Sequence, residues 1–182
     1  GDKKVKIVVL NASPHQNGTS SLLAEKFIEG AQEASHEIYR FDASFKKVHH
    51  CIACDRCKRS DNLCVFDDDM SELAPKLIEA DAVVYVTPLY YHDFPAQLKA
   101  IIDRYYRIND KLRQPKKTIL LVAAADNTEW LFDGIKASYL TNNRYMHWQD
   151  VGMLLASSCP TREAIEKTDY PQKAYEIGKN LQ

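Results

Sequence analysis

Short apolar runs alternate with stretches of helical spacing along this 182-residue chain. Residues 5–10, 82–86, 117–124 and 151–155 form nearly continuous apolar runs rich in β-branched residues, and each run predicts a buried strand. The weaker run 38–41 predicts a fifth strand, nearer to a sheet edge. Strands that are apolar on both faces are typical of a parallel sheet with helices on both sides.

Apolar positions between these runs recur at the spacing of amphipathic helices. The positions that carry this pattern are Leu22, Leu23, Phe27, Ile28 and Ala31, then Leu73, Leu77 and Ile78, then Leu98, Ile101, Ile102 and Tyr105, and finally Ala174, Ile177 and Leu181. Pro95 and Pro171 suit the first turns of the last two helices. Asp69 and Glu72 stand at capping-box spacing before the second helix, although such a box usually begins with Ser or Thr.

Strands that alternate with helices predict an α/β protein. Five strands with a polar loop after the first is the count of the flavodoxin-like three-layer sandwich, a five-stranded parallel sheet of order 2-1-3-4-5 with helices on both faces. A (β/α)₈ barrel would need eight such units and a longer chain. We therefore expect one domain over residues 1–182. Residues 45–68 and 126–148 are longer than simple connections require, and the first segment reads as a cysteine-rich insert.

Charge and hydropathy exclude several classes of partner. The formal net charge is −1 and the isoelectric point is about 6.7, so nothing steers the protein toward nucleic acid or an anionic membrane. The apolar run near the start is too short for a signal peptide, and the longest run, 119–125, is too short to span a membrane. The sequence therefore predicts a cytoplasmic protein with no nucleic-acid or membrane partner.

The polar loop that joins the first strand to the first helix has the composition of an anion site. It offers a turn at Asn17-Gly18, free backbone N–H groups at a helix N-terminus, and the hydroxyls of Ser13, Thr19, Ser20 and Ser21. These donors and the helix dipole favour a phosphate group. The loop is neither a Walker loop nor a G-x-G-x-x-G fingerprint. The alternative is an ordinary turn that caps the helix.

A second loop, residues 87–95, follows the next central strand. In an open parallel sheet of this order, ligands bind at the carboxyl ends of the strands where the strand order reverses, which is between these two loops. Tyr90, Tyr91 and Phe94 offer aromatic surface for a planar ring there, although each could instead pack onto the following helix. The two loops together predict a site for a phosphorylated ring compound.

Four of the five cysteines fall within 14 residues, at C-x2-C-x2-C-x6-C spacing. A reducing cytosol disfavours disulfides. The opening C-x2-C-x2-C is that of ferredoxin loops, whereas zinc sites more often use two separated C-x2-C pairs. This spacing favours a [4Fe–4S] cluster over zinc. The charged residues Asp55, Arg56, Lys58 and Arg59 suggest an exposed loop and count against a cluster, so a metal-free loop is the second alternative and zinc the third. His49 and His50 are interpreted as a solvated pair, and Cys159 as a small buried hydrophobe.

Four motifs together resemble the NADPH-dependent FMN reductase family and, within it, the iron-sulfur flavoproteins. They are SPHQNGTSSLL at 13–23, CIACDRC at 51–57 with Cys64, DDDM at 67–70, and TPLYYHDFPAQLKAIIDR at 87–104. The resemblance is continuous from about residue 5 to residue 104 and weaker beyond. It implies bound FMN, NAD(P)H as co-substrate and a possible [4Fe–4S] cluster.

Carried over position by position, the resemblance assigns three groups of residues. The FMN phosphate would lie at Ser13, His15, Asn17, Gly18, Thr19 and Ser20; the isoalloxazine would lie at Pro88, Leu89, Tyr90, Tyr91 and His92, and at Ala125, Asp126 and Asn127; the metal ligands would be Cys51, Cys54, Cys57 and Cys64. His15 stands where the family pattern has a cation of fixed charge, so phosphate binding would depend on pH. No side chain is assigned a catalytic role.

The resemblance implies an oxidoreductase that passes a hydride from NAD(P)H through FMN to flavin, quinone or a similar acceptor. The first alternative is an electron carrier with FMN and a cluster that exchanges electrons with a ferredoxin-type partner. A second is a non-catalytic binding module with a metal-stapled loop. A homodimer or homotetramer is also implied, with the cysteine loop and residues 126–148 at the interface.

Overall fold

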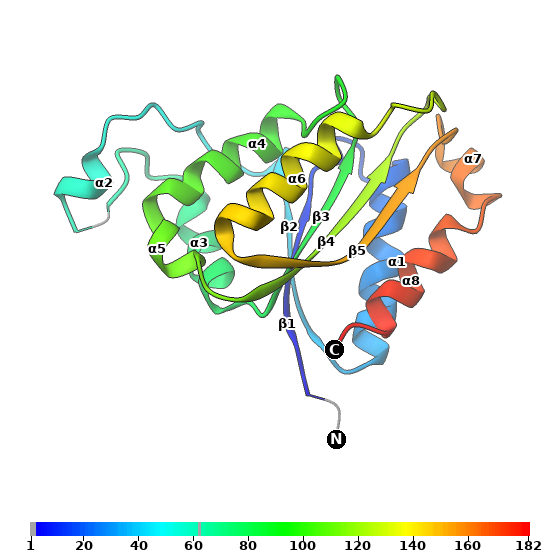
Figure 1. The fold of residues 1–182 in the computed structure, drawn as a ribbon, viewed down its shortest axis with the longest axis horizontal. Helices are drawn as coiled ribbons and strands as arrows, with labels where there is room; N and C mark the ends of the chain where they lie inside the picture. Colours follow the sequence, from blue (N-terminus) through cyan, green and yellow to red (C-terminus); the bar gives the residue numbers. More distant parts are fainter. Residues whose placement is uncertain (1–2, 62) are drawn as a thin grey trace.

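The computed structural model describes residues 3–61 and 63–182, and its centre is a five-stranded sheet between two layers of helices (Figure 1). The strands are β1 Lys6–Asn11, β2 Glu37–Asp42, β3 Ala82–Pro88, β4 Lys116–Ala123 and β5 Trp148–Ala156. Their order is β2-β1-β3-β4-β5, and every neighbouring pair is parallel. The predicted flavodoxin-like fold and strand order are confirmed.

Helices cover both faces of the sheet, as Figure 1 shows. One face carries α1 Thr19–Glu33, α7 Arg162–Glu166 and α8 Tyr170–Lys179; the other carries α3 Met70–Glu79, α4 Ala96–Asp103, α5 Asn109–Leu112 and α6 Asp133–Met146. Two 3₁₀ helices, η1 Ala43–Phe45 and η2 Arg104–Ile108, and the short helix α2 Arg56–Arg59 complete the fold. The carboxyl ends of all five strands lie at one edge of the sheet.

The alternation of side chains along the strands divides the core into two layers. On β1, Val8 and Leu10 face the layer of α3, α4 and α6, while Ile7 and Val9 face α1 and α8. Because both faces of the central strands are buried, the runs are apolar at nearly every position; the exceptions are Lys6 in the first run and Lys117 and Thr118 in the third. Full burial of one such side chain stabilises the fold by about 1.5–3 kcal/mol.

Helices α1 and α8 touch through their backbones at two glycines. A Cβ atom on Gly30 of α1 would lie 2.0 Å from the Tyr175 carbonyl oxygen, and one on Gly178 of α8 would lie 2.1 Å from the Phe27 carbonyl oxygen. Side chains of any size are therefore excluded from both positions. This crossing fixes α1, whose N-terminus forms part of the candidate site.

Two local expectations are wrong. The segment 126–148 is not mainly an irregular connection, because its greater part forms the 14-residue helix α6. No capping box forms at the start of α3: the Asp69 carboxylate accepts a hydrogen bond from the Lys47 backbone N–H at 2.6 Å, and Glu72 pairs with Lys46 at 2.6 Å. Both carboxylates are thus used to hold the segment that leads into the cysteine loop.

Candidate functional site

The loops predicted to form the site meet at the carboxyl edge of the sheet. The Ala12 N–H, just after β1, donates to the Val86 carbonyl of β3 at 2.8 Å. The Leu89 N–H donates to the Ala123 carbonyl of β4 at 3.1 Å. The loops after β1, β3 and β4 are therefore neighbours, in the order that the sheet topology requires.

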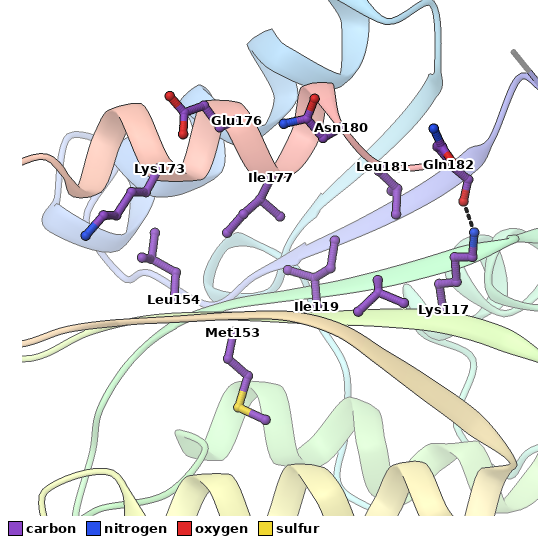
Figure 2. A pocket seen from close by; sticks show the side chains of 11 residues that line it. Lys117, Ile119, Met153, Leu154, Lys173, Glu176, Ile177, Asn180, Leu181 and Gln182 are labelled. Carbon is purple, nitrogen blue, oxygen red and sulfur yellow. Dashed lines mark hydrogen bonds between the residues drawn. The ribbon is translucent and has the colours of Figure 1, made fainter.

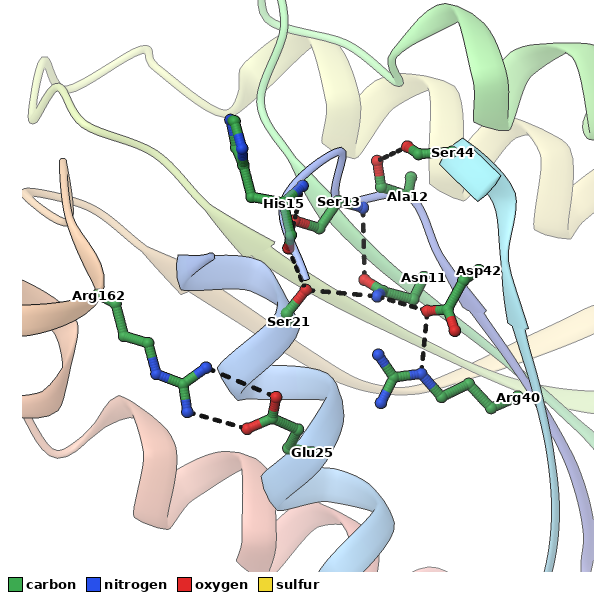
Figure 3. Close-up of polar contacts among 10 residues, drawn as sticks. All are labelled: Asn11, Ala12, Ser13, His15, Ser21, Glu25, Arg40, Asp42, Ser44 and Arg162. Carbon is green, nitrogen blue, oxygen red and sulfur yellow. Dashed lines mark hydrogen bonds and ion pairs between the residues drawn. The ribbon is translucent and has the colours of Figure 1, made fainter. Parts of the chain in front are cut away.

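The turn after β1 is held by hydrogen bonds from within the protein (Figure 3). The Ser13 and Ser21 hydroxyls both donate to the His15 carbonyl, at 2.8 and 2.9 Å. The buried Asn11 side chain accepts from the Ser13 N–H at 3.4 Å and donates to Asp42 at 2.9 Å. Figure 3 shows the His15 ring directed away from these serines. The turn is thus rigid before any ligand binds, and the Ser13 hydroxyl is already engaged.

The N-terminus of α1 presents unpaired backbone donors beside this turn. The first intrahelical bond runs from the Leu22 N–H to the Gly18 carbonyl at 3.2 Å, so the N–H groups of Thr19, Ser20 and Ser21 point out of the helix end. No side chain among the described residues caps this end. A Cβ on Gly18 would lie 3.0 Å from the Ser13 hydroxyl, which shows how closely the turn folds over the helix. These features fit the phosphate of FMN.

The loop after β3 contains a strained two-residue turn. Tyr90 and Asp93 exchange backbone hydrogen bonds, and the two residues between them, Tyr91 and His92, have φ angles of 45° and 64°. Turns with two positive φ angles favour Asn-Gly, and other side chains adopt them at a cost of about 1–3 kcal/mol each. The Asp93 carboxylate accepts from Ser138 of α6 at 2.9 Å, which helps to hold the turn in place.

The residues proposed for the ring side of the site lie at or near the surface. Pro88, Leu89 and His92 are half-buried, Tyr90 is exposed, and Tyr91 is fully exposed. The loop after β4, residues 125–127, is exposed throughout. The arrangement suits a planar ring that an external reactant must reach.

The four clustered cysteines are free thiols that line one small cavity. The backbone N–H of Ala53 points at the Cys51 sulfur and that of Phe66 at the Cys64 sulfur, each at 3.5 Å. Such N–H donors stabilise thiolates and sulfur-bound clusters. The donor set therefore fits a sulfur-ligated group.

The cavity has a volume of about 30 Å³. Among residues 3–61 and 63–182, no three His, Cys, Asp or Glu side chains are arranged around a single ion. His49 and His50 are exposed, and the His49 ring stacks on the His50 ring and on Phe66, which lines the same cavity.

An ion pair that the sequence analysis did not identify holds the base of the cysteine loop. Arg104 binds the Asp68 carboxylate through both terminal nitrogens, at 2.8 and 3.1 Å, and donates to the His49 carbonyl at 2.8 Å. The two side chains are 3% and 11% exposed. Burial opposes ionisation of Asp68, but the Arg104 hydrogen bonds and the backbone N–H groups of His49 and Met70 outweigh it, so its pKa lies below the ordinary 3.8.

We expect Asp68→Asn to destabilise the protein by about 3–5 kcal/mol at neutral pH, because it leaves the Arg104 charge buried and unpaired. Since the Asp68 pKa is lowered by folding, its stabilising effect is present above the ordinary carboxyl value of 3.8 and is lost as the pH falls through the lower folded value. Urea unfolding of both proteins from pH 7 to pH 3 tests this. A difference in unfolding free energy that does not shrink below about pH 4 contradicts it.

A groove with apolar walls lies away from these loops. It has a volume of about 490 Å³ and runs between β4, β5 and α8, with Ile119, Leu154 and Ile177 in its wall and Lys173 and Glu176 at its rim (Figure 2). Figure 2 shows these charged side chains directed away from one another. At the other end of the groove, Lys117 donates a hydrogen bond to the Gln182 carbonyl, so this ammonium group is already engaged within the chain.

The fold is that of a flavodoxin-like α/β protein, with a hydrogen-bonded turn and an uncapped helix N-terminus where the strand order reverses. Residues 5–150 match the family described as NADPH-dependent FMN reductase, and the chain belongs to that family. An iron-sulfur flavoprotein of Methanosarcina thermophila is 35% identical over 100 residues, which are 55% of this chain and 52% of that protein. One of Methanocaldococcus jannaschii is 30% identical over 125 residues, 68% of this chain and 64% of that protein. The chain thus matches between half and two thirds of the length of these relatives.

Solved structures share the fold along nearly the whole chain. An NAD(P)H:quinone oxidoreductase from Methanothermobacter marburgensis superposes with a TM-score of 0.78 at 21% identity, covering 99% of this chain and 100% of its own. An azoreductase from Bacillus anthracis gives 0.72 at 16% identity, covering 97% and 100%. At these identities the likeness shows the fold alone. Among the described residues, no helix has both the length and the apolar character needed to cross a bilayer.

Proposed function

We propose that this protein is an FMN-dependent oxidoreductase that uses NAD(P)H to reduce a flavin, a quinone or a similar small acceptor. The observation that carries the proposal is the uncapped N-terminus of α1, with the outward N–H groups of residues 19–21, beside a turn that is already rigid. It lies where the strand order reverses, and the family assignment makes FMN the ligand with matching chemistry.

In this proposal the chain binds and orients, and it needs no acid or base of its own. Ser13, Asn17 and Gly18 shape the phosphate turn, and Thr19 and Ser20 supply donors to the phosphate. Bound FMN supplies hydride chemistry between nicotinamide and acceptor. Electrons and protons balance in this reaction. NAD(P)H gives up one hydride, which carries two electrons and one proton, and the quinone takes its second proton from water. The open surface at Tyr90 and Tyr91 admits both reactants in turn.

A second function is supported by the cysteine loop. Four free thiols line one cavity, and the relatives named above are called iron-sulfur flavoproteins. We propose that Cys51, Cys54, Cys57 and Cys64 hold a [4Fe–4S] cluster, which suits the reducing conditions of the cytoplasm. With such a cluster the protein can exchange single electrons with a ferredoxin-type partner.

Anaerobic purification, followed by an absorbance spectrum and analysis of iron, sulfide and zinc, tests the cofactors. We expect one FMN, four irons and four sulfides per chain; Cys57→Ser should lose the iron and keep the FMN. Cys159→Ser is the matched control, because Cys159 is buried outside the loop and should retain both. A protein that takes up no FMN after reconstitution is incompatible with the proposed function.

Steady-state assays then separate the two functions. Oxidation of NADH or NADPH with added FMN or quinone, retained in Cys57→Ser, supports the small-acceptor reductase. Flavin reduction that requires reduced ferredoxin and is lost in Cys57→Ser supports the carrier. The two outcomes differ because only the carrier needs the cluster between its partner and the flavin.

A further inference from the structure

Among the side chains of residues 3–61 and 63–182, one buried nitrogen or oxygen atom has no hydrogen-bond partner, and it is the Nε of Arg104. The ion pair with Asp68 uses both terminal nitrogens of the guanidinium and leaves this N–H free. An unsatisfied buried donor costs about 1–3 kcal/mol, and more when the group is charged. Such an atom therefore calls for a ligand or a partner that binds only in the loaded protein.

Arg104 lines the cavity that the four cysteines share. Its guanidinium also lies over the Phe66 ring, 5.7 Å from the ring centre, and Phe66 lines the same cavity. The Arg104 side chain is 3% exposed, so its charge is screened little by water. The cavity wall thus holds an interior cation beside four thiols; its terminal nitrogens are paired with Asp68, and its Nε–H is a spare donor.

Arg107 adds a second cation to this wall, whereas Asp55, its one carboxylate, accepts a hydrogen bond from the Tyr106 hydroxyl at 2.9 Å. Four thiolates around an iron–sulfur core leave the group net negative in each redox state. Charge and hydrogen bonds to sulfur are among the factors that set the potential of such a group. The reduced state carries more negative charge, so nearby cations and hydrogen bonds to sulfur stabilise it more than the oxidised state.

We propose that Arg104 is the internal counter-cation of the cysteine-bound group and donates its Nε–H to one of the sulfurs. This inference rests on the proposed cluster. It gives Arg104 a double role: the two terminal nitrogens position the loop through Asp68 and the His49 carbonyl, and Nε tunes the group that the loop holds. Removal of the donor should make the cluster harder to reduce.

The test is a redox titration of the anaerobically reconstituted protein, monitored by EPR, with FMN in place. We expect Arg104→Gln to lower the equilibrium constant for cluster reduction about tenfold, which corresponds to about 59 mV for one electron. Arg104→Lys keeps a charge that can pair with Asp68 but lacks the planar Nε–H, and it should shift the potential in the same direction. The double variant Asp68→Asn/Arg104→Gln removes both charges of the ion pair and so leaves no buried charge unpaired. It replaces Arg104→Gln in the titration if the single variant does not fold.

Arg162→Gln is the matched control. It removes one arginine from α7, which lies on the opposite side of the molecule from α2 (Figure 1). Arg162 pairs there with Glu25, and its substitution should not change the cluster potential. A second readout is selective ¹⁵N labelling of arginine: a weak ¹⁵N coupling to the reduced cluster should be present in the wild type and absent in Arg104→Lys.

The outcomes distinguish this inference from the proposed function. If the wild type holds a cluster and either Arg104 variant that folds keeps the wild-type potential, the inference is overturned and the cluster assignment stands. If the reconstituted wild type holds no iron, the cluster assignment and the inference fall together. A shifted potential in the Arg104 variants with an unchanged Arg162→Gln supports the inference.

Discussion

Thr19→Asp is expected to weaken FMN binding about 100-fold or more while stabilising the protein without ligand. Thr19 is the first residue of α1, and its N–H is one of the outward donors. A carboxylate there would lie near a bound phosphate, and two like charges about 4 Å apart repel by about 4 kcal/mol at an effective dielectric constant of about 20. Even half of this repulsion energy would weaken FMN binding more than tenfold. The same carboxylate interacts favourably with the helix dipole, by about 0.3–1 kcal/mol.

Riboflavin and Thr19→Asn make this experiment specific. Riboflavin has the ring of FMN and no phosphate, so its affinity for Thr19→Asp should stay within about threefold of the wild-type value. Asparagine has nearly the shape of aspartate without the charge, so Thr19→Asn should bind FMN almost normally. Fluorescence titration gives the dissociation constants, and thermal unfolding of the apoprotein gives the stability. Equal losses for FMN and riboflavin would place the phosphate elsewhere.

Much of the fold could be predicted from the sequence because the central strands are buried on both faces. Every residue of 82–86 is apolar, and all five are buried in the structure. Helix α6 escaped prediction because its buried face is partly polar. Ile135, Tyr139 and Met146 are apolar, but Asn143 occupies the core position between the last two and donates to Thr118 at 2.8 Å. A hydrogen-bonded asparagine in the core interrupts the apolar spacing on which the prediction depends.

The meeting of the candidate loops could be predicted because parallel strands bring their carboxyl ends to one edge. The Arg104–Asp68 pair could not, since the sequence does not show that Asp68, 36 positions before Arg104, is also buried and lies beside it. One signal was present: Arg104 follows Leu98 and Ile101 at helical spacing and so continues the apolar face of α4. The strained Tyr91-His92 turn was not predicted either, because a tyrosine rarely adopts a positive φ angle and a single histidine is a weak signal for one.

Gly178→Ala is expected to destabilise the protein by about 3 kcal/mol, although alanine is intrinsically the better helix former by about 1 kcal/mol. The new methyl group would lie 2.1 Å from the Phe27 carbonyl oxygen and 3.0 Å from the Ala31 nitrogen, and both are backbone atoms of α1. Neither atom can move alone, so α8 has to shift away from α1 and lose packing along the whole crossing. Chemical denaturation followed by circular dichroism measures the loss.

Gly30→Ala and Gly152→Ala sharpen this prediction. Gly30 faces the same crossing from α1, so its substitution should cost a similar amount; the double variant should lose less than the sum, because one displacement of α8 relieves both contacts. Gly152 lies in β5, where a Cβ would meet only side chains at 3.5 Å or more, and Gly152→Ala should change the unfolding free energy by less than about 0.5 kcal/mol. If the losses of unfolding free energy at Gly30 and Gly178 are additive, the two glycines act at independent contacts. The close crossing of α1 and α8 would then not be what holds the N-terminus of α1 in place.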